Sequence, residues 1–361
     1  MLSPVGSTRL TLPTLGLIEG YYGEPWSWAA RTETMRFLAP RGYGFYLYAP
    51  KADAYLRRRW RDLHPPEMRE PLARFAADCR AAGVKFGVGL SPYELYRAFD
   101  GEARADLARK LDDLKGLGLD WLAILFDDMK GDLPGLADRQ VEIMHFIAER
   151  AGVERLILCP TYYTDDPVLD RVFGPRPEGY LVELGRALDP AIDIFWTGEE
   201  VCAQEFSLAH LKRVAEALGR KPFIWDNYPV NDGQRMSRFL HLRAFTGRPA
   251  AMAEHIAGHA VNPALQPVLS RIPCLSLADS YRLGEAYAYG EAFRRAARLV
   301  AGDALAERLW RDLGLLQDSA LERMSAYKDR LRERYAAFDH DAAREVMAFL
   351  DGAYAFDGEL E

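Results

Sequence analysis

Residues 121–128 read WLAILFDD, and this stretch decides the fold. Its apolar part, Trp121 to Phe126, runs without interruption, as in a strand of a parallel sheet that helices cover on both faces. Asp127 and Asp128 then follow at the carboxyl end of the strand, the end that carries the active site in an α/β barrel. The pair is therefore a catalytic candidate, although from these residues alone one Asp could instead cap the next helix and the other could be solvated.

Seven further β-rich runs share this pattern, with helix-like segments between them. They begin at Leu15 (LGLIEG), Gly44 (GFYLYAP), Lys85 (KFGVGLSP), Arg155 (RLILCPT), Asp193 (DIFWTG), Lys221 (KPFIWDN) and Gly258 (GHAVNP). Intervening segments such as 68–83 and 206–220 have apolar residues three and four positions apart and a glycine near their end, as helices do. Strand and helix alternating in this way predict an α/β fold, a (β/α)8 TIM barrel that occupies residues 1–281.

The strand signals stop after about Tyr281, where the chain becomes rich in Ala, Arg and Leu. Apolar residues then recur at helical spacing, for example Phe293, Ala297 and Val300. This pattern predicts a C-terminal helical domain, residues 282–361, packed against the barrel. A later stripe (Met324, Tyr327, Leu331, Tyr335 and Phe338) is expected to be core, and the same helices could form a homodimer surface.

Composition argues against several classes of partner. Asp and Glu outnumber Lys and Arg by 53 to 46, and no basic block of the kind that follows a phosphate backbone is present, so nucleic acid is not expected as a partner. The cysteines have neither CxxC pairing nor a histidine at zinc-ligand spacing, so we expect no metal, no cofactor and a reducing compartment. They are Cys79, Cys159, Cys202 and Cys274.

The beginning of the chain lacks the pattern of a secretory signal, and no stretch reaches the roughly 18 apolar residues of a membrane span. We therefore expect a cytoplasmic protein that does not associate with membranes.

Polar and aromatic residues gather where the predicted strands end. Tyr22, Tyr163 and Trp225 stand there beside carboxylates and amides, a combination that fits a sugar-sized pocket better than a loop surface. The strand ends carry Glu19, Tyr21, Tyr22, Lys51, Ser91, Asp127, Asp128, Thr161, Tyr163, Trp196, Thr197, Asp226, Asn227 and Asn262.

With its segments in this order, the chain resembles glycoside hydrolase family 84, the O-GlcNAcase and bacterial β-N-acetylglucosaminidase family. The matching motifs are GLIEGYYGEPW from Gly16, YAPKAD from Tyr48, LFDD from Leu125, CPTYY from Cys159, DIFWTG from Asp193, IWDNYPVND from Ile224, NP at Asn262 and IPCLSLA from Ile272. The chain departs from the family at Ala52, where a second acid is usual, and at SPYELY from Ser91, where SPG is usual. Such departures lie around the rim of the predicted pocket rather than at the acid pair. They therefore bear on which aglycone, the part of the substrate that leaves, the protein accepts.

The resemblance implies a retaining exo-β-N-acetylglucosaminidase that removes terminal β-linked N-acetylglucosamine (GlcNAc) from glycosides or glycoproteins. In such enzymes the acetamido oxygen of the substrate acts as the nucleophile and forms an oxazoline. By motif position Asp127 stays ionised to orient the acetamido N–H, and Asp128 is the general acid and then the general base.

The resemblance also implies the residues that bind the sugar. They are Gly20, Tyr22, Lys51, Tyr163, Trp225, Asn227, Asp232 and Asn262. Gly20 would allow close approach of the backbone, Lys51 would donate to a hydroxyl, and Tyr163 would bond near the oxazoline. Trp225 would form a wall of the acetamido pocket. Asn227 and Asp232 would hold the acetamido group and the 4- and 6-hydroxyls, with Asn262 sharing the latter.

Each of these residues also has a structural alternative. Lys51 could be a solvated loop lysine, Trp225 could be barrel core, and Asp232 could be a helix cap or turn residue; Asn227 and Asn262 could likewise sit in turns. For the whole chain the alternatives are a hyaluronidase-like hexosaminidase and a non-catalytic sugar-binding barrel, since a fold does not fix function.

Overall fold

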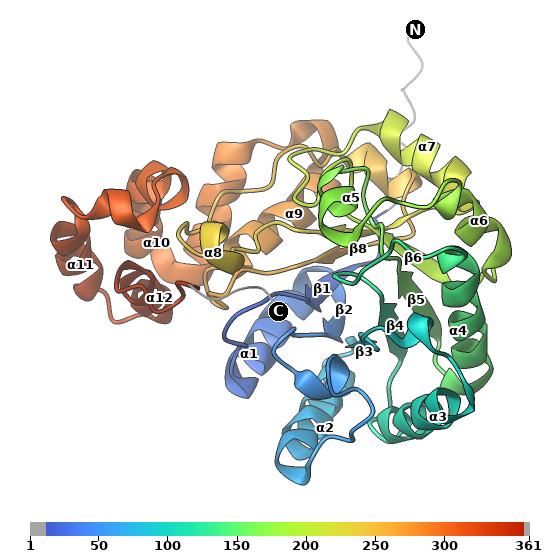
Figure 1. Cartoon of the computed structure of the whole chain (residues 1–361). Coiled ribbons are helices and arrows are strands. Elements are labelled where there is room, and N and C mark those ends of the chain that lie inside the picture. The colour runs from blue at the N-terminus through green and yellow to red at the C-terminus, as the bar shows by residue number, and fades with distance from the viewer. Residues whose placement is uncertain (1–11, 357–361) are drawn as a thin grey trace, which may run out of the picture.

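The computed structural model describes residues 12–356, and its centre is a closed barrel of eight parallel strands paired in chain order (Figure 1). The strands are β1 (Leu15–Glu19), β2 (Tyr43–Tyr48), β3 (Lys85–Leu90), β4 (Trp121–Leu125), β5 (Arg155–Cys159), β6 (Asp193–Trp196), β7 (Phe223–Asp226) and β8 (Gly258–Val261). Each predicted run coincides with one strand to within a few residues at its ends, so the prediction of a TIM barrel is confirmed.

Helices surround the barrel and connect most of the strands (Figure 1). They are α1 (Trp28–Leu38), α2 (Pro66–Ala81), α3 (Gly101–Lys115), α4 (Leu136–Ala151), α5 (Val168–Phe173), α6 (Tyr180–Ala187), α7 (Leu208–Leu218) and α9 (Arg271–Leu283). Both segments singled out for their periodicity, 68–83 and 206–220, are helical over most of their length, as α2 and α7.

The connection between β7 and β8 departs from the expected alternation of strand and helix. It contains only the one-turn α8 (Gly233–Met236) and the 3₁₀ turn Ala250–Glu254. Its backbone is held instead by the C-terminal region, because Gln317 Oε1 accepts hydrogen bonds from the N–H groups of Leu242 (2.6 Å) and Arg243 (3.0 Å). This segment therefore takes its shape from a distant part of the chain.

Aromatic side chains fill the lower part of the barrel, below the carboxyl ends of the strands. The rings of Phe45 and Trp121 are 4.6 Å apart, and both contact Phe223. At the amino-terminal end the Arg155 guanidinium lies 5.0 Å from the Trp121 ring and 4.9 Å from the Phe223 ring. Its Nε donates to Asp193 at 2.5 Å. The barrel thus has a closed floor.

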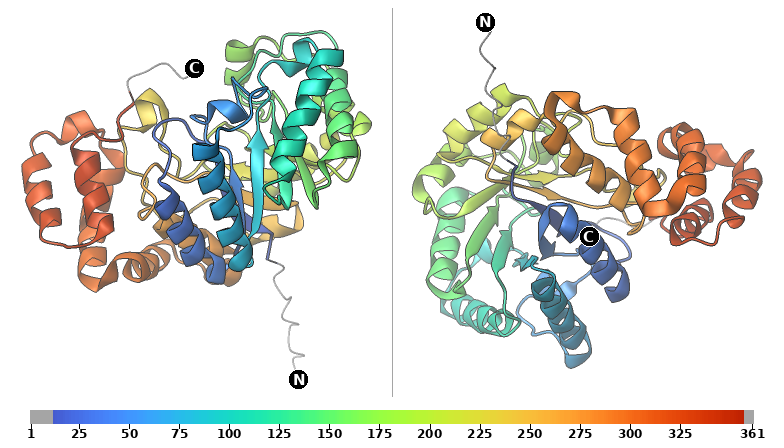
Figure 2. Two further views of the ribbon diagram at one scale, coloured as in Figure 1. Left: turned by 90° about the horizontal axis from the view of Figure 1, so that it is seen from below. Right: turned by 180° about the vertical axis from the view of Figure 1, so that it is seen from behind.

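The C-terminal helices form a lobe to one side of the barrel (Figures 1 and 2). They are α10 (Tyr289–Asp318), which bends at Gly302, α11 (Lys328–Ala336) and α12 (Asp341–Leu350). Phe293 and Tyr335 are buried as expected, but Tyr327 is 50% exposed, so its placement in the core was wrong. It precedes α11 and lies outside the helical face that packs inward. The domain boundary after residue 281 stays a prediction.

The tight contact between Gly16 and Phe45 gives a test of barrel packing. A Cβ at Gly16 would lie 2.4 Å from both Cγ and the carbonyl oxygen of Phe45, whereas a Cβ at Gly44 in the adjacent strand meets nothing within 4 Å. We expect Gly16→Ala to lower the free energy of unfolding by about 1–3 kcal/mol. Gly44→Ala, the control, should change it by less than about 0.5 kcal/mol. Urea unfolding measures both, and equal losses would contradict this account of the packing.

Candidate active site

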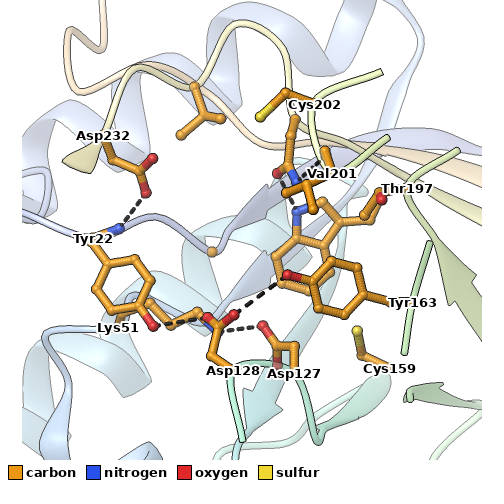
Figure 3. A pocket seen from close by; sticks show the side chains of 14 residues that line it. Tyr22, Lys51, Asp127, Asp128, Cys159, Tyr163, Thr197, Val201, Cys202 and Asp232 are labelled. Atoms are coloured by element: carbon orange, nitrogen blue, oxygen red, sulfur yellow. Dashed lines mark hydrogen bonds and ion pairs between the residues drawn. The ribbon is translucent and has the colours of Figure 1, made fainter. Parts of the chain in front are cut away.

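A cavity of about 180 Å³ opens at the carboxyl ends of the strands (Figure 3). It brings together residues from loops after six strands, β1, β2, β4, β5, β6 and β7. The residues predicted from sequence that line it are Gly20, Tyr22, Lys51, Asp127, Asp128, Tyr163, Trp225, Asn227 and Asp232. Cys159, Thr197, Val201, Cys202 and Val230 complete the lining.

The acid pair follows directly from the end of β4. Neither Asp caps the next helix, because Gly135 is the N-cap residue of α4, so that alternative was wrong. Asp128 has φ 56°, in the left-handed region that a non-glycine residue seldom adopts. Backbone strain of this kind, of the order of 1–3 kcal/mol, tends to be kept where a site requires it.

Lys51 joins the two acids through a buried ion-pair network (Figure 3). Its Nζ lies 2.5 Å from Asp127 Oδ2 and 3.4 Å from Asp128 Oδ2, and its side chain is 4% exposed. The alternative of a solvated loop lysine was therefore wrong. Burial alone would lower the pKa of Lys51, but the two carboxylates outweigh it and raise that pKa above its usual value, so the ammonium stays charged.

The surroundings shift the pKa values of the two carboxyl groups in opposite directions. Burial raises the pKa of Asp127, and the Lys51 ammonium offsets this only in part. At Asp128 burial acts in the same direction, but the charge of Lys51 and the hydrogen bond from Tyr22 outweigh it and leave the pKa below its usual value. These surroundings therefore favour a proton on Asp127 over one on Asp128.

Hydrogen bonding also distinguishes the two acids. Asp127 Oδ1 is buried and has no hydrogen-bond partner among residues 12–356. Asp128 accepts from the hydroxyls of Tyr22 (2.8 Å) and Tyr163 (3.4 Å). Burial raises the pKa of both tyrosines, so both remain protonated donors. The Asp128 side chain is 25% exposed and that of Asp127 is 6% exposed, so Asp128 lies closer to the opening.

Trp225 and Asn227 form a further part of the cavity wall, and Asn262 is hydrogen-bonded to Asn227. Asn227 Oδ1 accepts from Trp225 Nε1 and from Asn262 Nδ2, each at 3.0 Å, and its own Nδ2 donates to the Val201 carbonyl at 2.8 Å. Asn262 Oδ1 in turn accepts from Gly20 N at 3.2 Å. Asn262 does not itself line the cavity, and its expected contact with a sugar hydroxyl stays a prediction.

Packing against Trp225 requires glycine at position 20, in addition to the expected approach of a sugar to the backbone. A Cβ at this position would lie 2.2 Å from Trp225 Cζ2. The absence of a side chain therefore lets the indole approach the backbone of the β1 loop, in addition to any approach of a sugar.

Asp232 occupies the N-cap position of α8, but its side chain makes no capping bond. Instead its Oδ2 accepts from the backbone N–H of Tyr22 at 2.8 Å, across the cavity from the acid pair (Figure 3). Burial raises the pKa of Asp232 despite this hydrogen bond. The helix-cap alternative was wrong, because the carboxylate faces the cavity.

Sequence reasoning missed four residues around the cavity. Val201, Cys202 and Val230 lie in the loops after β6 and β7, and their places just beyond DIFWTG and IWDN could have indicated them. Arg57 is buried, and its Nη2 lies 3.4 Å from the Tyr22 hydroxyl. No local pattern indicated it beyond the basic run that begins there.

A parallel barrel with an acid pair at the carboxyl ends of its strands, an aromatic wall and converging amides is the arrangement that barrel glycoside hydrolases have. Comparison with known families makes this specific: the model of the beta-N-acetylglucosaminidase family matches residues 15–311. The chain belongs to this family, and the resemblance found in its motifs is confirmed.

Two curated relatives are the proteins named Protein O-GlcNAcase of Mus musculus and of Rattus norvegicus. Each is 29% identical over 276 residues, which cover 74% of this chain and 30% of the relative. The chain thus spans about 30% of the length of these relatives. Among solved structures, a mutant of Thermobaculum terrenum O-GlcNAc hydrolase superposes with a TM-score of 0.77 at 28% identity, covering 92% of this chain and 72% of that one.

Residues 12–356 contain no group of three or more His, Cys, Asp or Glu side chains placed to hold a metal ion. No helix in this part of the chain is long and apolar enough to cross a membrane.

The Lys51–Asp127 pair predicts a pH-dependent stability defect. Lys51→Met leaves Asp127 buried without its cation, which should cost about 3–5 kcal/mol near neutral pH. Without the cation the pKa of Asp127 in the folded state lies still further above its pKa in the unfolded state. The contribution of Asp127 to the free energy of unfolding is therefore kept at pH values below the unfolded-state pKa. It is lost as the pH rises through the folded-state pKa. The loss relative to wild type should therefore be larger at about pH 7.5 than at about pH 4.5.

Urea unfolding at both pH values measures this difference. Lys51→Arg, which keeps the positive charge, is the matched control and should show a weaker pH dependence. A Lys51→Met defect of the same size at both pH values would mean that lost packing, rather than an unpaired carboxylate, causes it.

Proposed function

We propose that the protein is a retaining exo-β-N-acetylglucosaminidase in which the acetamido oxygen of the substrate is the nucleophile and an oxazoline is the intermediate. The observation that carries the proposal is the asymmetry of the acid pair. One carboxylate is deep and has an oxygen without a partner, and its neighbour is held by two tyrosines nearer the opening. Family membership supports the same reaction.

Asp127 is the residue that orients the acetamido group. Its buried Oδ1 is a hydrogen-bond acceptor without a donor among residues 12–356, and leaving such an oxygen unpaired is costly. The acetamido N–H of a bound sugar supplies that donor. The interaction makes the acetamido oxygen more nucleophilic, and the negative charge of Asp127 balances the positive charge that develops on the oxazoline.

Asp128 is the general acid for departure of the aglycone and the general base toward water in the second step. This role needs a proton on Asp128, whereas the surrounding protein groups favour the proton on Asp127. Binding of the sugar reverses the preference. The acetamido N–H favours the charged form of Asp127, and the aglycone displaces water from Asp128 and so disfavours its charged form.

The remaining residues bind the sugar in this proposal. Trp225 and Tyr163 flank the acetamido group, and Asn227, already fixed by Trp225 and Asn262, is presented in a single orientation. Asp232 binds hydroxyls at the non-reducing end, on the far side of the cavity from Asp128. A cavity that ends at Asp232 accepts one terminal sugar, which fits exo action.

The proposal extends to the substrate, the compartment and the oligomeric state of the protein. The substrate is a glycoside or glycoprotein with terminal β-linked GlcNAc, which the names of the relatives support. The protein works in the cytoplasm, where its four free cysteines would stay reduced. It forms a homodimer through the C-terminal helices, where Leu299 is 55% exposed.

Removing the nucleophile from the substrate tests the reaction. Purified protein should hydrolyse an aryl β-N-acetylglucosaminide and leave the corresponding aryl β-glucoside intact, because the glucoside lacks the acetamido group. Release of the phenol, followed by absorbance, measures both. Equal rates on the two sugars would exclude the oxazoline route, and no hydrolysis of either would favour a non-catalytic sugar-binding barrel.

Substitution of each acid tests the assignment of roles. Asp128→Ala should slow glycosides with poor leaving groups by about 10²- to 10⁴-fold and affect activated aryl glycosides much less, because only the former need protonation. Asp127→Ala should slow both kinds of substrate. The measurement is kcat/KM over a series of leaving groups. If the dependence on the leaving group appeared in Asp127→Ala instead, the two roles would be reversed.

A further inference from the structure

The loop after β6, residues 197–206, borders two cavities and is called the β6 loop below. Val201 and Cys202 line the catalytic cavity, and Cys202 is itself exposed. A second cavity, of about 310 Å³, is lined by Cys202, Ala203 and Gln204 of the same loop, among other residues. Because the β6 loop borders two cavities, side-chain packing covers it only in part, and its position depends on hydrogen bonds.

Arg248, in the connection between β7 and β8, supplies hydrogen bonds to this loop. Its side chain is 4% exposed, and its Nη1 and Nη2 donate to the carbonyls of Gln204 (2.5 Å) and Ala203 (2.8 Å). Nη1 also donates to the Thr246 carbonyl at 2.9 Å. The two remaining N–H groups donate to the Asp226 carboxylate, from Nε at 2.9 Å and from Nη2 at 2.7 Å. Each of the five N–H groups of the guanidinium thus has an acceptor.

Asp226 attaches the guanidinium to the barrel. It is the last residue of β7 and is 1% exposed, and its Oδ2 also lies 3.0 Å from Nε2 of His259 on β8. The next residue, Asn227, lines the catalytic cavity and donates from Nδ2 to the Val201 carbonyl at 2.8 Å. The β6 loop is therefore joined to the end of β7 twice, by Asn227 directly and by Arg248 through Asp226.

We propose that Arg248 is a positioning residue for sugar binding. It does not line the catalytic cavity, and it acts by holding the β6 loop so that Val201 and Cys202 stay at the cavity wall and Asn227 keeps its orientation. This inference rests on the proposed function and adds to it a residue outside the cavity. Because Asp127 and Asp128 follow β4, on another part of the barrel, Arg248 affects binding of the sugar rather than proton transfer.

Arg248→Lys tests the proposal without leaving Asp226 unpaired. Lysine keeps the positive charge, but its single nitrogen cannot reach the carboxylate and both loop carbonyls as the planar guanidinium does. We expect KM for an aryl β-N-acetylglucosaminide to rise about tenfold, and the Kd of free GlcNAc, measured by NMR titration, to rise by a similar factor. We expect kcat to change by less than about threefold and the dependence on the leaving group to stay that of wild type.

Arg220→Lys is the matched control. Arg220 lies just before β7, at the end of the barrel opposite the cavity, and it too holds backbone carbonyls, those of Gly185, Leu188, Asp189, Ile192 and Leu218. This variant should lower the urea midpoint as Arg248→Lys does, yet keep the wild-type KM and GlcNAc affinity.

Hydrogen exchange reports on the loop independently of activity. The Phe206 N–H donates to the Gly247 carbonyl at 2.9 Å, beside Arg248. A peptide that covers residues 199–206 should exchange faster in Arg248→Lys than in wild type, and at the wild-type rate in Arg220→Lys.

The proposal would be overturned by an unchanged KM and GlcNAc affinity in Arg248→Lys, or by equal increases in both variants. A changed dependence on the leaving group in Arg248→Lys would overturn it as well, because Arg248 would then act on the acid pair. If Arg248→Lys does not fold, the double variant Asp226→Asn with Arg248→Gln, which removes both buried charges, takes its place in every measurement. Absence of hydrolysis of every GlcNAc glycoside by wild type would overturn the proposed function instead, and the GlcNAc affinities would still decide the role of Arg248.

Discussion

The cavity is built around one buried ammonium that faces two carboxylates. Lys51 cannot neutralise both Asp127 and Asp128, and two ionised carboxylates that share one buried cation are unfavourable. The surrounding groups are arranged to meet this constraint. The hydroxyls of Tyr22 and Tyr163 stabilise charge on Asp128, and deep burial favours a proton on Asp127. In the proposed reaction, a bound sugar shifts the proton from Asp127 to Asp128.

Packing beneath the cavity holds the side chains that line it in position. Phe45, Trp121 and Phe223 fill the lower barrel, and glycine at position 16 leaves the space that Phe45 needs. Higher up, Gly20 does the same for Trp225, which in turn donates to Asn227. The ligand-facing wall is therefore a continuation of the barrel core rather than a separate loop structure, which limits how far its polar groups can move.

The sequence predicted those parts of the molecule that depend on local pattern. The strand at 121–125 and the position of the acids after it follow from an uninterrupted apolar run, and the other strands follow from similar runs. The region between β7 and β8 was not predicted, because Gln317 on α10 determines its backbone hydrogen bonds. Arg57 was missed for the same reason: its relation to Tyr22 exists only in the folded barrel. The role of Asn262 as a link between Gly20 and Asn227 could not be read from the NP motif either.

In the proposed reaction, the filled lower end of the barrel determines the order in which the two products leave. Arg155 and the aromatic rings above it fill the barrel beneath the cavity, so we expect a ligand to enter and leave at the carboxyl ends of the strands. In the proposed reaction the aglycone occupies the mouth and the sugar the interior. The aglycone therefore departs first, water arrives through the space it vacates, and the free sugar is released last. Such a blind pocket makes the sugar product a competitor of the next substrate, and turnover is then coupled to how quickly the interior empties.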